Sequence, residues 1–139
     1  MVISVKKKIL SVIVPAYNVE KYIEKCLDSF EQIERKSDVE VIVVDDGSSD
    51  QTAVIARQYC ERYPDIFYVY TKENGGHGSA INYGLKYVTG KYFKVVDADD
   101  WVDSKEMEQF LDYMEKNEVD VIASNFVCIQ DETYKVLEK

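Results

Sequence analysis

The chain has 139 residues, a length that fits one folded domain with its own hydrophobic core. Apolar residues make up 46% of the sequence and eleven residues are tyrosine, a composition that excludes an intrinsically disordered chain. The formal net charge of −9 disfavours nucleic acid and anionic membrane surfaces as partners, because like charges repel.

Strands and helices are predicted to alternate along the chain. Short runs of apolar and β-branched residues are typical of strands that are buried on both faces of a parallel sheet. In chain order, the predicted strands are Ile9–Val14, Val39–Val44, Ile66–Tyr70, Tyr92–Val96 and a fifth that begins within Val119–Ile129. Pro15 is predicted to end the first strand, because proline has no backbone N–H to donate.

Helices are predicted between these strands, where apolar residues recur three and four positions apart. The first is Val19–Ile33, and the second is capped by Ser49 or Asp50 and ended by Pro64. The third is marked by Ile81, Gly84, Leu85 and Val88 and is stopped by Gly90. The fourth begins at Asp103, which forms a capping box with Glu106. The alternation predicts an α/β fold with a mostly parallel sheet, flanked by helices, in a single domain over residues 1–139.

Ligands of such sheets bind beyond the carboxyl ends of the strands, so the loops that follow the first four strands are informative. The loop after strand four contains Asp97, Asp99 and Asp100. Asp97 and Asp99 share a side-chain direction if strand geometry continues, and carboxylates held together destabilise each other. A divalent cation such as Mg²⁺ or Mn²⁺ would relieve this repulsion and bridge two phosphates. Turn and cap chemistry is the alternative; we favour it for Asp103 and leave it open for Asp100.

The loop after strand two begins with Asp45 and Asp46, followed by a glycine turn and a helix start. A carboxylate at this place can accept the imide N–H of uracil or a ribose hydroxyl. A turn with an N-cap explains residues 48–50 but not two acids before the turn. One of the two acids can still serve only to hold loop backbone.

Two further loops complete this edge of the predicted sheet. After strand one, Pro15 and Ala16 leave space for a flat ring on which Tyr17 can stack, and an ordinary turn with a core tyrosine is the alternative. After strand three, the glycines beside Asn74 let the backbone approach a ligand at a helix N-terminus. His77, the only histidine, either lines this pocket or is structural or merely exposed.

Together, the four loops resemble those of family 2 glycosyltransferases with the GT-A fold, which is Rossmann-like. The resemblance is carried by Val12–Asn18, Val43–Asp50, Asn74–Gly76 and Val96–Trp101. It implies inverting transfer of a sugar, of the hexosyltransferase type, from a nucleotide donor that is usually a UDP-sugar. It also implies Mn²⁺ or Mg²⁺ as cofactor and a polysaccharide, lipid-linked or protein acceptor.

The resemblance also assigns roles to individual residues. The nucleotide-sugar would be bound by Pro15, Ala16, Tyr17, Glu20, Asp46, Asn74, His77, Asp97 and Ala98. Asp46 would hydrogen-bond the uracil, and Asp97 with Asp99 would form the metal-binding DxD motif, in which Asp99 is the main contact. Many relatives carry an arginine where this chain has Ile81, so phosphate contacts are expected from His77 or from backbone N–H groups.

The general base of the family is an acid on a later segment. Nothing after Val119 resembles that segment, because Asp131 and Glu132 lie in a polar tail. We therefore expect the chain to be the amino-terminal, nucleotide-binding portion of a longer enzyme, inactive alone and able to self-associate, with its catalytic base beyond Lys139. The alternative function is a non-catalytic nucleotide-sugar-binding module. A phospho-acceptor receiver domain is disfavoured, because strand one ends in Pro-Ala-Tyr and not in an acidic pair.

Cysteine usage and hydropathy bear on the compartment. Cys26, Cys60 and Cys128 are odd in number and widely spaced, so we expect three reduced, mostly buried thiols and no disulfide or zinc site. The first residues lack the charge order of a signal peptide, and no apolar run reaches the ~20 residues of a membrane span. The expectation is a cytoplasmic protein, or a longer protein at the inner face of the membrane.

Overall fold

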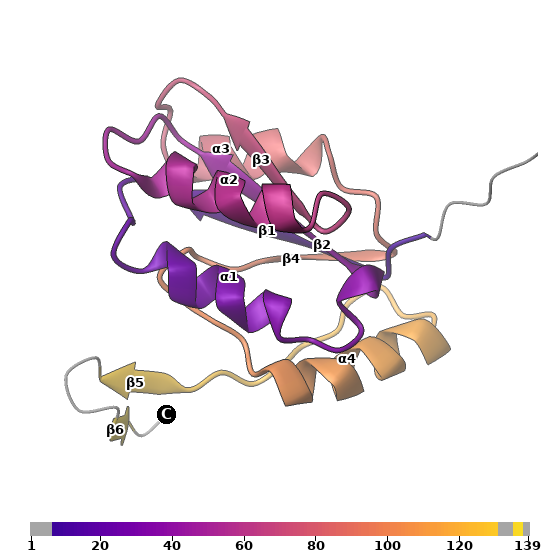
Figure 1. The fold of residues 1–139 in the computed structure, drawn as a ribbon. Coiled ribbons are helices and arrows are strands. Elements are labelled where there is room, and N and C mark those ends of the chain that lie inside the picture. Colours follow the sequence, from indigo (N-terminus) through magenta and orange to yellow (C-terminus); the bar gives the residue numbers. More distant parts are fainter. Residues whose placement is uncertain (1–6, 131–134, 138–139) are drawn as a thin grey trace, which may run out of the picture.

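The computed structural model describes residues 7–130 and 135–137 and shows a parallel sheet with helices on both faces (Figure 1). The strands lie in the order β3-β2-β1-β4, and every neighbouring pair is parallel. Their bounds are Leu10–Ala16 for β1, Val39–Asp45 for β2, Phe67–Thr71 for β3 and Tyr92–Val95 for β4. The predicted α/β fold with a parallel sheet is confirmed.

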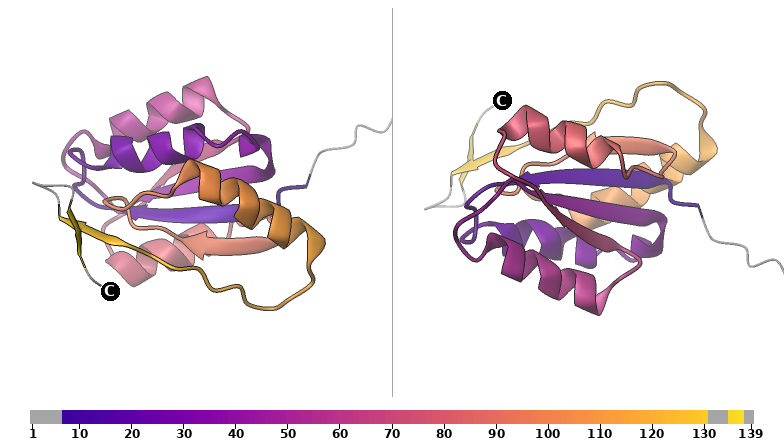
Figure 2. Two further views of the ribbon diagram at one scale, coloured as in Figure 1. Left: turned by 90° about the horizontal axis from the view of Figure 1, so that it is seen from below. Right: turned by 90° about the horizontal axis from the view of Figure 1, so that it is seen from above.

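The helices cover the two faces of the sheet unequally. Helices α1, α2 and α4 lie on one face, whereas α3 lies alone on the other (Figure 2). Their bounds are Ile23–Glu31 for α1, Thr52–Arg62 for α2, His77–Leu85 for α3 and Ser104–Lys116 for α4, with a short 3-10 helix, η1, at Lys36–Asp38. The larger core lies under the three helices and a smaller one under α3. Strands β1 and β2 are buried throughout, as predicted, whereas β3 and β4 are only partly buried.

Strand β1 continues through Pro15 to Ala16, so the prediction that this proline ends the strand is wrong. The carbonyl of Ile13 accepts from Val96 on the β4 side. The carbonyl of Ala16 accepts from Asp46 on the β2 side. Because successive residues of a parallel strand alternate between its neighbours, the nitrogen of Pro15 faces the β4 side, where pairing ends at Ile13. The proline therefore costs the sheet no hydrogen bond.

Helix α1 begins at Ile23, later than the predicted start at Val19. The backbone N–H groups of Val19 and Glu20 donate to the side chains of Thr52 and Asp50. These bonds tie the segment before α1 to the loop after β2. Asp50, one of the two predicted caps, also accepts from the backbone N–H of Thr52 at 2.9 Å, at the start of α2.

The segment after α4 does not add a fifth strand to the parallel sheet. Of the predicted strand within Val119–Ile129, only the end is extended, as Cys128–Gln130 (β5), which pairs antiparallel with Lys135–Leu137 (β6) in a separate sheet (Figure 1). Val121 and Phe126 are 83% and 74% exposed. Much of the apolar pattern that predicted the strand is therefore exposed, although Ile122 packs against the larger core.

The three cysteines are free, as predicted, but they differ in burial. Cys26 is buried, Cys60 is half-buried and Cys128 is exposed, so the prediction of mostly buried thiols is wrong for Cys128, which lies in the small second sheet. Asp131 and Glu132 lie outside the described residues. Within the part of the chain that the structure describes, no helix is long and apolar enough to cross a membrane.

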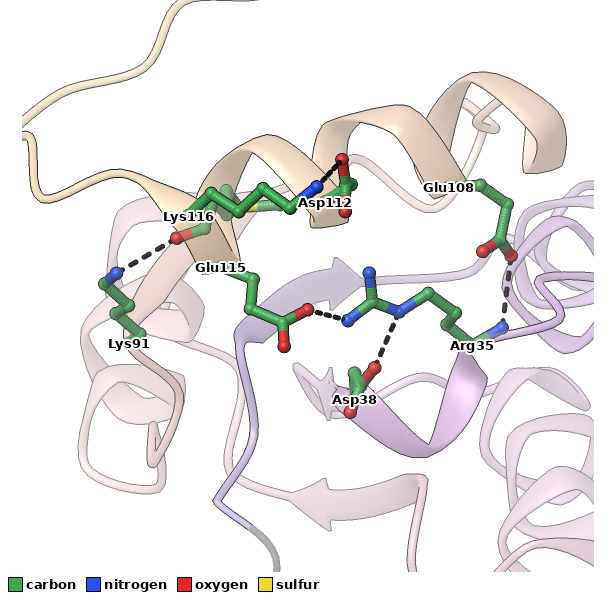
Figure 3. Close-up of polar contacts among 8 residues, drawn as sticks. Arg35, Asp38, Lys91, Glu108, Asp112, Glu115 and Lys116 are labelled. Atoms are coloured by element: carbon green, nitrogen blue, oxygen red, sulfur yellow. Dashed lines mark hydrogen bonds and ion pairs between the residues drawn. The ribbon is translucent and has the colours of Figure 1, made fainter.

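Charged side chains anchor α4 beside η1 (Figure 3). The guanidinium of Arg35 donates from Nε to Asp38 at 2.9 Å and also bonds to Glu115 of α4. The backbone N–H of Arg35 donates to Glu108, on the same helix, at 3.1 Å. At the far end of α4, the ammonium of Lys91 donates to two backbone carbonyls at 3.0 and 2.9 Å. These bonds fix α4, and with it the acidic loop that leads into the helix.

Helix α3 packs closely on the sheet through Gly84. A Cβ atom at this position would lie 2.8 Å from Cγ2 of Ile13 and 3.2 Å from Cγ2 of Val44. Both neighbours are β-branched residues of buried strands and have little rotamer freedom. We therefore expect Gly84→Ala to lower the free energy of unfolding by about 1–3 kcal/mol, measured by urea denaturation.

The matched control is Gly78→Ala in the same helix, where a Cβ would meet nothing within 4 Å. Alanine should stabilise the helix at that position by about 0.5–1 kcal/mol. Equal effects of the two substitutions would contradict the close approach of α3 to the sheet.

Candidate functional site

Three carboxylates gather at the carboxyl end of β4. Asp97, Asp99 and Asp100 are exposed, and each offers an oxygen within 4.8 Å of the others. The backbone N–H of Asp100 donates to the carbonyl of Asp97 at 2.9 Å, so a turn folds the three side chains together. Ala98, between Asp97 and Asp99 in the sequence, is buried, whereas the three carboxylates are exposed. The structure thus brings the predicted pair together and adds Asp100, for which the sequence left a turn role open.

The surroundings of this cluster concentrate negative charge. Although Asp100 is exposed, partial desolvation of its carboxyl group, and then the charges of Asp99 and Asp97, raise its pKa above the ordinary value. Beneath the cluster, the thiol of Cys26 donates to the carbonyl of Asp97 at 3.8 Å. Burial and the three carboxylates raise the pKa of Cys26 to about 12, so this thiol stays neutral. Hard carboxylate oxygens with unrelieved repulsion are a donor set that fits Mg²⁺ or Mn²⁺.

His77, the first residue of α3, lies beside this cluster. Its Nε2 atom is 3.5 Å from Oδ1 of Asp97, and the two side chains are 62% and 51% exposed. The loop after β3 and the loop after β4 therefore meet at one place. The amino-terminal end of a helix favours anions, and α3 begins at His77. His77 is exposed, and its role in lining a nucleotide-sugar pocket stays a prediction.

Asp46 organises the loop after β3. It is 3% exposed at the end of β2. Its carboxylate accepts from the ammonium of Lys72 at 2.8 Å, and from the backbone N–H groups of Gly75 and Gly76 at 2.9 and 2.8 Å. Burial acts to raise the pKa of Asp46, but these hydrogen bonds outweigh it and the pKa lies below its ordinary value. The amide of Asn74 adds a longer contact to the carboxylate at 3.4 Å.

Asp45 also holds loop backbone. It is 2% exposed, and its carboxylate accepts from the N–H of Ser48 at 3.0 Å and from the hydroxyl of Thr71 at 3.3 Å. The sequence allowed one acid of the pair such a role, and in the structure both have it. Direct contact between Asp46 and a base stays a prediction.

The loop after β1 places an aromatic ring at the same edge of the sheet. Pro15 and Ala16 are buried, whereas Tyr17 is 52% exposed, so the alternative of a core tyrosine is wrong. The carboxylate of Glu20 accepts from the backbone N–H of Gln51 at 3.0 Å, at the start of α2. Glu20 thus has a structural role near Tyr17, and its contact with a base or ribose stays a prediction.

Sequence reasoning missed Lys72. Its side chain is only 14% exposed and is paired with Asp46. A lysine shortly after a strand is ordinarily a solvated residue, so no local pattern marks it. The one available signal was indirect, because buried carboxylates need a cation or several N–H donors nearby.

Comparison with known proteins gives a consistent result. Residues 11–138 match the family model described as "Glycosyl transferase family 2". Among solved structures, TarS 1-349 from S. aureus, in complex with UDP-GlcNAc, is 35% identical with a TM-score of 0.67, over 78% of this chain and 31% of that chain. The mannosyltransferase PcManGT from Pyrobaculum calidifontis, in complex with GDP-Man and Mn²⁺, is 32% identical with a TM-score of 0.63, over 69% of this chain and 29% of that chain.

A curated relative points the same way. The minor teichoic acid biosynthesis protein GgaB of Bacillus subtilis (strain 168) is 39% identical over 116 residues, which are 81% of this chain. The matched region is 13% of GgaB, so the chain spans a small part of that relative's length.

Proposed function

Because the chain belongs to glycosyltransferase family 2 and has its GT-A, Rossmann-like fold, we propose that it binds a UDP-sugar through a divalent metal. The reaction served is inverting transfer of a hexose-type sugar to a polysaccharide, lipid-linked or protein acceptor. The observation that carries this proposal is the cluster of Asp97, Asp99 and Asp100 at the sheet edge that also presents Tyr17.

The acid cluster would hold the metal, with Asp99 as the main contact and Asp97 beside it. Three exposed carboxylates leave coordination positions for water and for phosphate oxygens, as Mg²⁺ and Mn²⁺ require. When bound, such an ion neutralises charge on the departing diphosphate. The relative solved with GDP-Man and Mn²⁺ supports a divalent metal in this family.

The base would lie at the edge formed by the loops after β1 and β2. Tyr17 supplies an exposed ring for stacking, over the buried Pro15 and Ala16, and Glu20 stands nearby for the ribose. Asp46 would accept the uracil imide. The longest of its contacts is the one from the amide of Asn74 to Oδ2, at 3.4 Å. We therefore propose that the base approaches Asp46 at Oδ2, from the side of Asn74.

The diphosphate would lie between the metal and the start of α3. Ile81 carries no charge, so His77 and the first backbone N–H groups of α3 would supply the phosphate contacts. The separation of 3.5 Å between His77 and Asp97 supports this, because a metal-bound phosphate at Asp97 would also be within reach of the imidazole.

A thermal-shift panel of UDP, GDP, CDP and ADP, each with Mn²⁺ and with chelator, tests the proposal. UDP with Mn²⁺ should raise the melting temperature most. GDP is the critical competitor, because one relative was solved with GDP-Man. A larger shift with GDP would contradict the choice of base, and no shift with any nucleotide would contradict the donor site.

Residues 1–139 alone are expected to bind the donor without multiple-turnover transfer. Among the described residues at this edge, Asp97, Asp99 and Asp100 are assigned to the metal, and Asp45 and Asp46 accept backbone N–H groups. A positioned general base typically contributes ~10²–10⁴ in rate. The assay measures UDP release from a panel of UDP-sugars with and without candidate acceptors. Sustained acceptor-dependent turnover would mean that the base lies within this sequence, and would also exclude the alternative of a non-catalytic module.

A further inference from the structure

The face of the sheet that carries α3 has an open cavity away from the donor edge. Its volume is about 660 Å³, and it is lined by residues of β2, β3 and the segment after α3, together with Lys7 and Lys8 before β1. Helix α3 lies alone on this face and packs on Ile13 and Val44 (Figure 2). The cavity extends from Glu40 and Tyr68, near the amino-terminal ends of β2 and β3, to Tyr70, which pairs with Val44.

Glu40 provides a buried carboxylate in the cavity wall. It is 4% exposed. Its Oε1 atom accepts from the hydroxyl of Ser11, and from the backbone N–H and hydroxyl of Thr89 at 2.7 and 2.8 Å. Within the described residues, every hydrogen bond of Glu40 falls on Oε1. The other oxygen, Oε2, carries none of these bonds and is not among the fully buried unpaired atoms of the described residues, so it is open to a ligand donor in the cavity.

Tyrosine rings form the sides of the cavity. The rings of Tyr70 and Tyr87 are stacked, with centroids 3.8 Å apart and planes at 11°. Burial, and then the charge of Glu40, raise the pKa values of Tyr68 and Tyr70, so their hydroxyls remain protonated donors. Lys86 lies at the rim with its ammonium 4.7 Å from the ring centroid of Tyr83. The cavity thus combines apolar ring faces with one free acceptor and several donors.

We propose that this cavity is a second carbohydrate site, which binds a pyranose unit of a glycan. The apolar face of the sugar would lie against the tyrosine rings, one hydroxyl would donate to Oε2 of Glu40, and another would accept from Lys86. Glu40 and Asp46 lie at opposite ends of β2, roughly 20 Å apart at the rise of a strand. The bound unit is therefore not the donor sugar, and this proposal does not rest on the proposed donor function.

The test uses cellotetraose, chitotetraose and maltotetraose as probes of residues 1–139, by saturation-transfer NMR and calorimetry. At least one should bind with millimolar or better affinity, unchanged by saturating UDP with Mn²⁺. Glu40→Gln keeps an acceptor for Ser11 and Thr89 but removes the charge, and Tyr87→Leu removes one ring. Each should weaken binding at least about fivefold, or ~1 kcal/mol. Tyr17→Leu, at the donor edge, is the matched control and should bind the glycan as the wild type does.

Three results would overturn the proposal. No tetrasaccharide binds, or UDP with Mn²⁺ displaces the one that does, or the folded variants at Glu40 and Tyr87 bind it unchanged. If Glu40→Gln does not fold, Tyr87→Leu alone decides. Failure here would leave UDP binding intact, whereas failure of the donor proposal would leave glycan binding intact, so the two are distinguishable.

Discussion

Asp46→Ala is expected to be the most destabilising of the site substitutions. It removes one partner of an ion pair whose side chains are 4% and 14% exposed, and it deprives the N–H groups of Gly75 and Gly76 of their acceptor. Breaking a buried pair in this way typically costs about 3–5 kcal/mol, and the partial exposure of Lys72 favours the lower end. Urea unfolding measures the effect. Adding Lys72→Met to Asp46→Ala should recover part of the loss, because the unpaired ammonium is then removed.

The pH dependence of this loss follows from the pKa of Asp46. That pKa is lower in the folded state than in the unfolded state. The ionised carboxylate therefore stabilises the fold above its unfolded pKa, and this contribution is lost as the pH falls toward the folded pKa. The difference between wild type and Asp46→Ala should shrink in acid. A difference that stays constant down to acid pH would contradict the role of the ionised pair.

Asp46→Ala should also weaken UDP binding at least tenfold, since a hydrogen bond to a charged acceptor contributes ~1.5–3 kcal/mol. Comparison of UDP with CDP separates two roles. If Asp46 accepts the uracil imide, discrimination between the two bases falls with affinity. If affinity falls equally for both, Asp46 acts only through the loop at Asn74–Gly76. A larger effect of Asp45→Ala would mean that the neighbouring acid reads the base.

Asp99→Asn is expected to abolish the metal-dependent part of UDP binding and to leave the fold intact. The side chain is exposed, so its replacement removes no buried contact. The neutral amide is a poorer ligand for a hard cation, and we expect at least about a tenfold loss of UDP affinity in Mn²⁺, or ~1.4 kcal/mol. Thermal shift with UDP, in Mn²⁺ and in chelator, gives the readout.

Asp103→Asn is the matched control for this substitution. Asp103 accepts from the backbone N–H groups of Lys105 and Glu106 and caps α4, a role that asparagine also fills. This variant should keep both the stability and the Mn²⁺ effect. If Asp99→Asn retains the Mn²⁺ effect as Asp103→Asn does, the acid cluster is not the metal site.

The main elements could be predicted because their signals are local. The apolar runs of β1 and β2 are buried on both faces, and Asp103 caps α4 as its position in the sequence indicates. Predictions failed where a partner far along the chain decides the outcome. Pro15 stays in β1 because β4 has already ended beside it. Residues of Val119–Ile129 have a strand-like pattern, but only its end is extended, and several of its apolar side chains are exposed.

In the candidate site, too, local features could be predicted, whereas contacts between distant segments could not. Asp97, Asp99 and Asp100 lie within four residues after the end of β4, so their clustering follows from their closeness in the sequence. The approach of His77 to Asp97, and of Lys72 to Asp46, joins loops that follow different strands. Such pairs depend on strand order and loop conformation, which the sequence pattern does not specify.

The central claim is that one metal-dependent site at the carboxyl edge of the sheet binds the donor nucleotide. Calorimetric titration of the chain with UDP, once in Mn²⁺ and once in EDTA, tests it most directly. We predict at least about tenfold tighter binding in Mn²⁺, because the cation would bridge the acid cluster and the diphosphate. Equal affinity in the two conditions would contradict the claim.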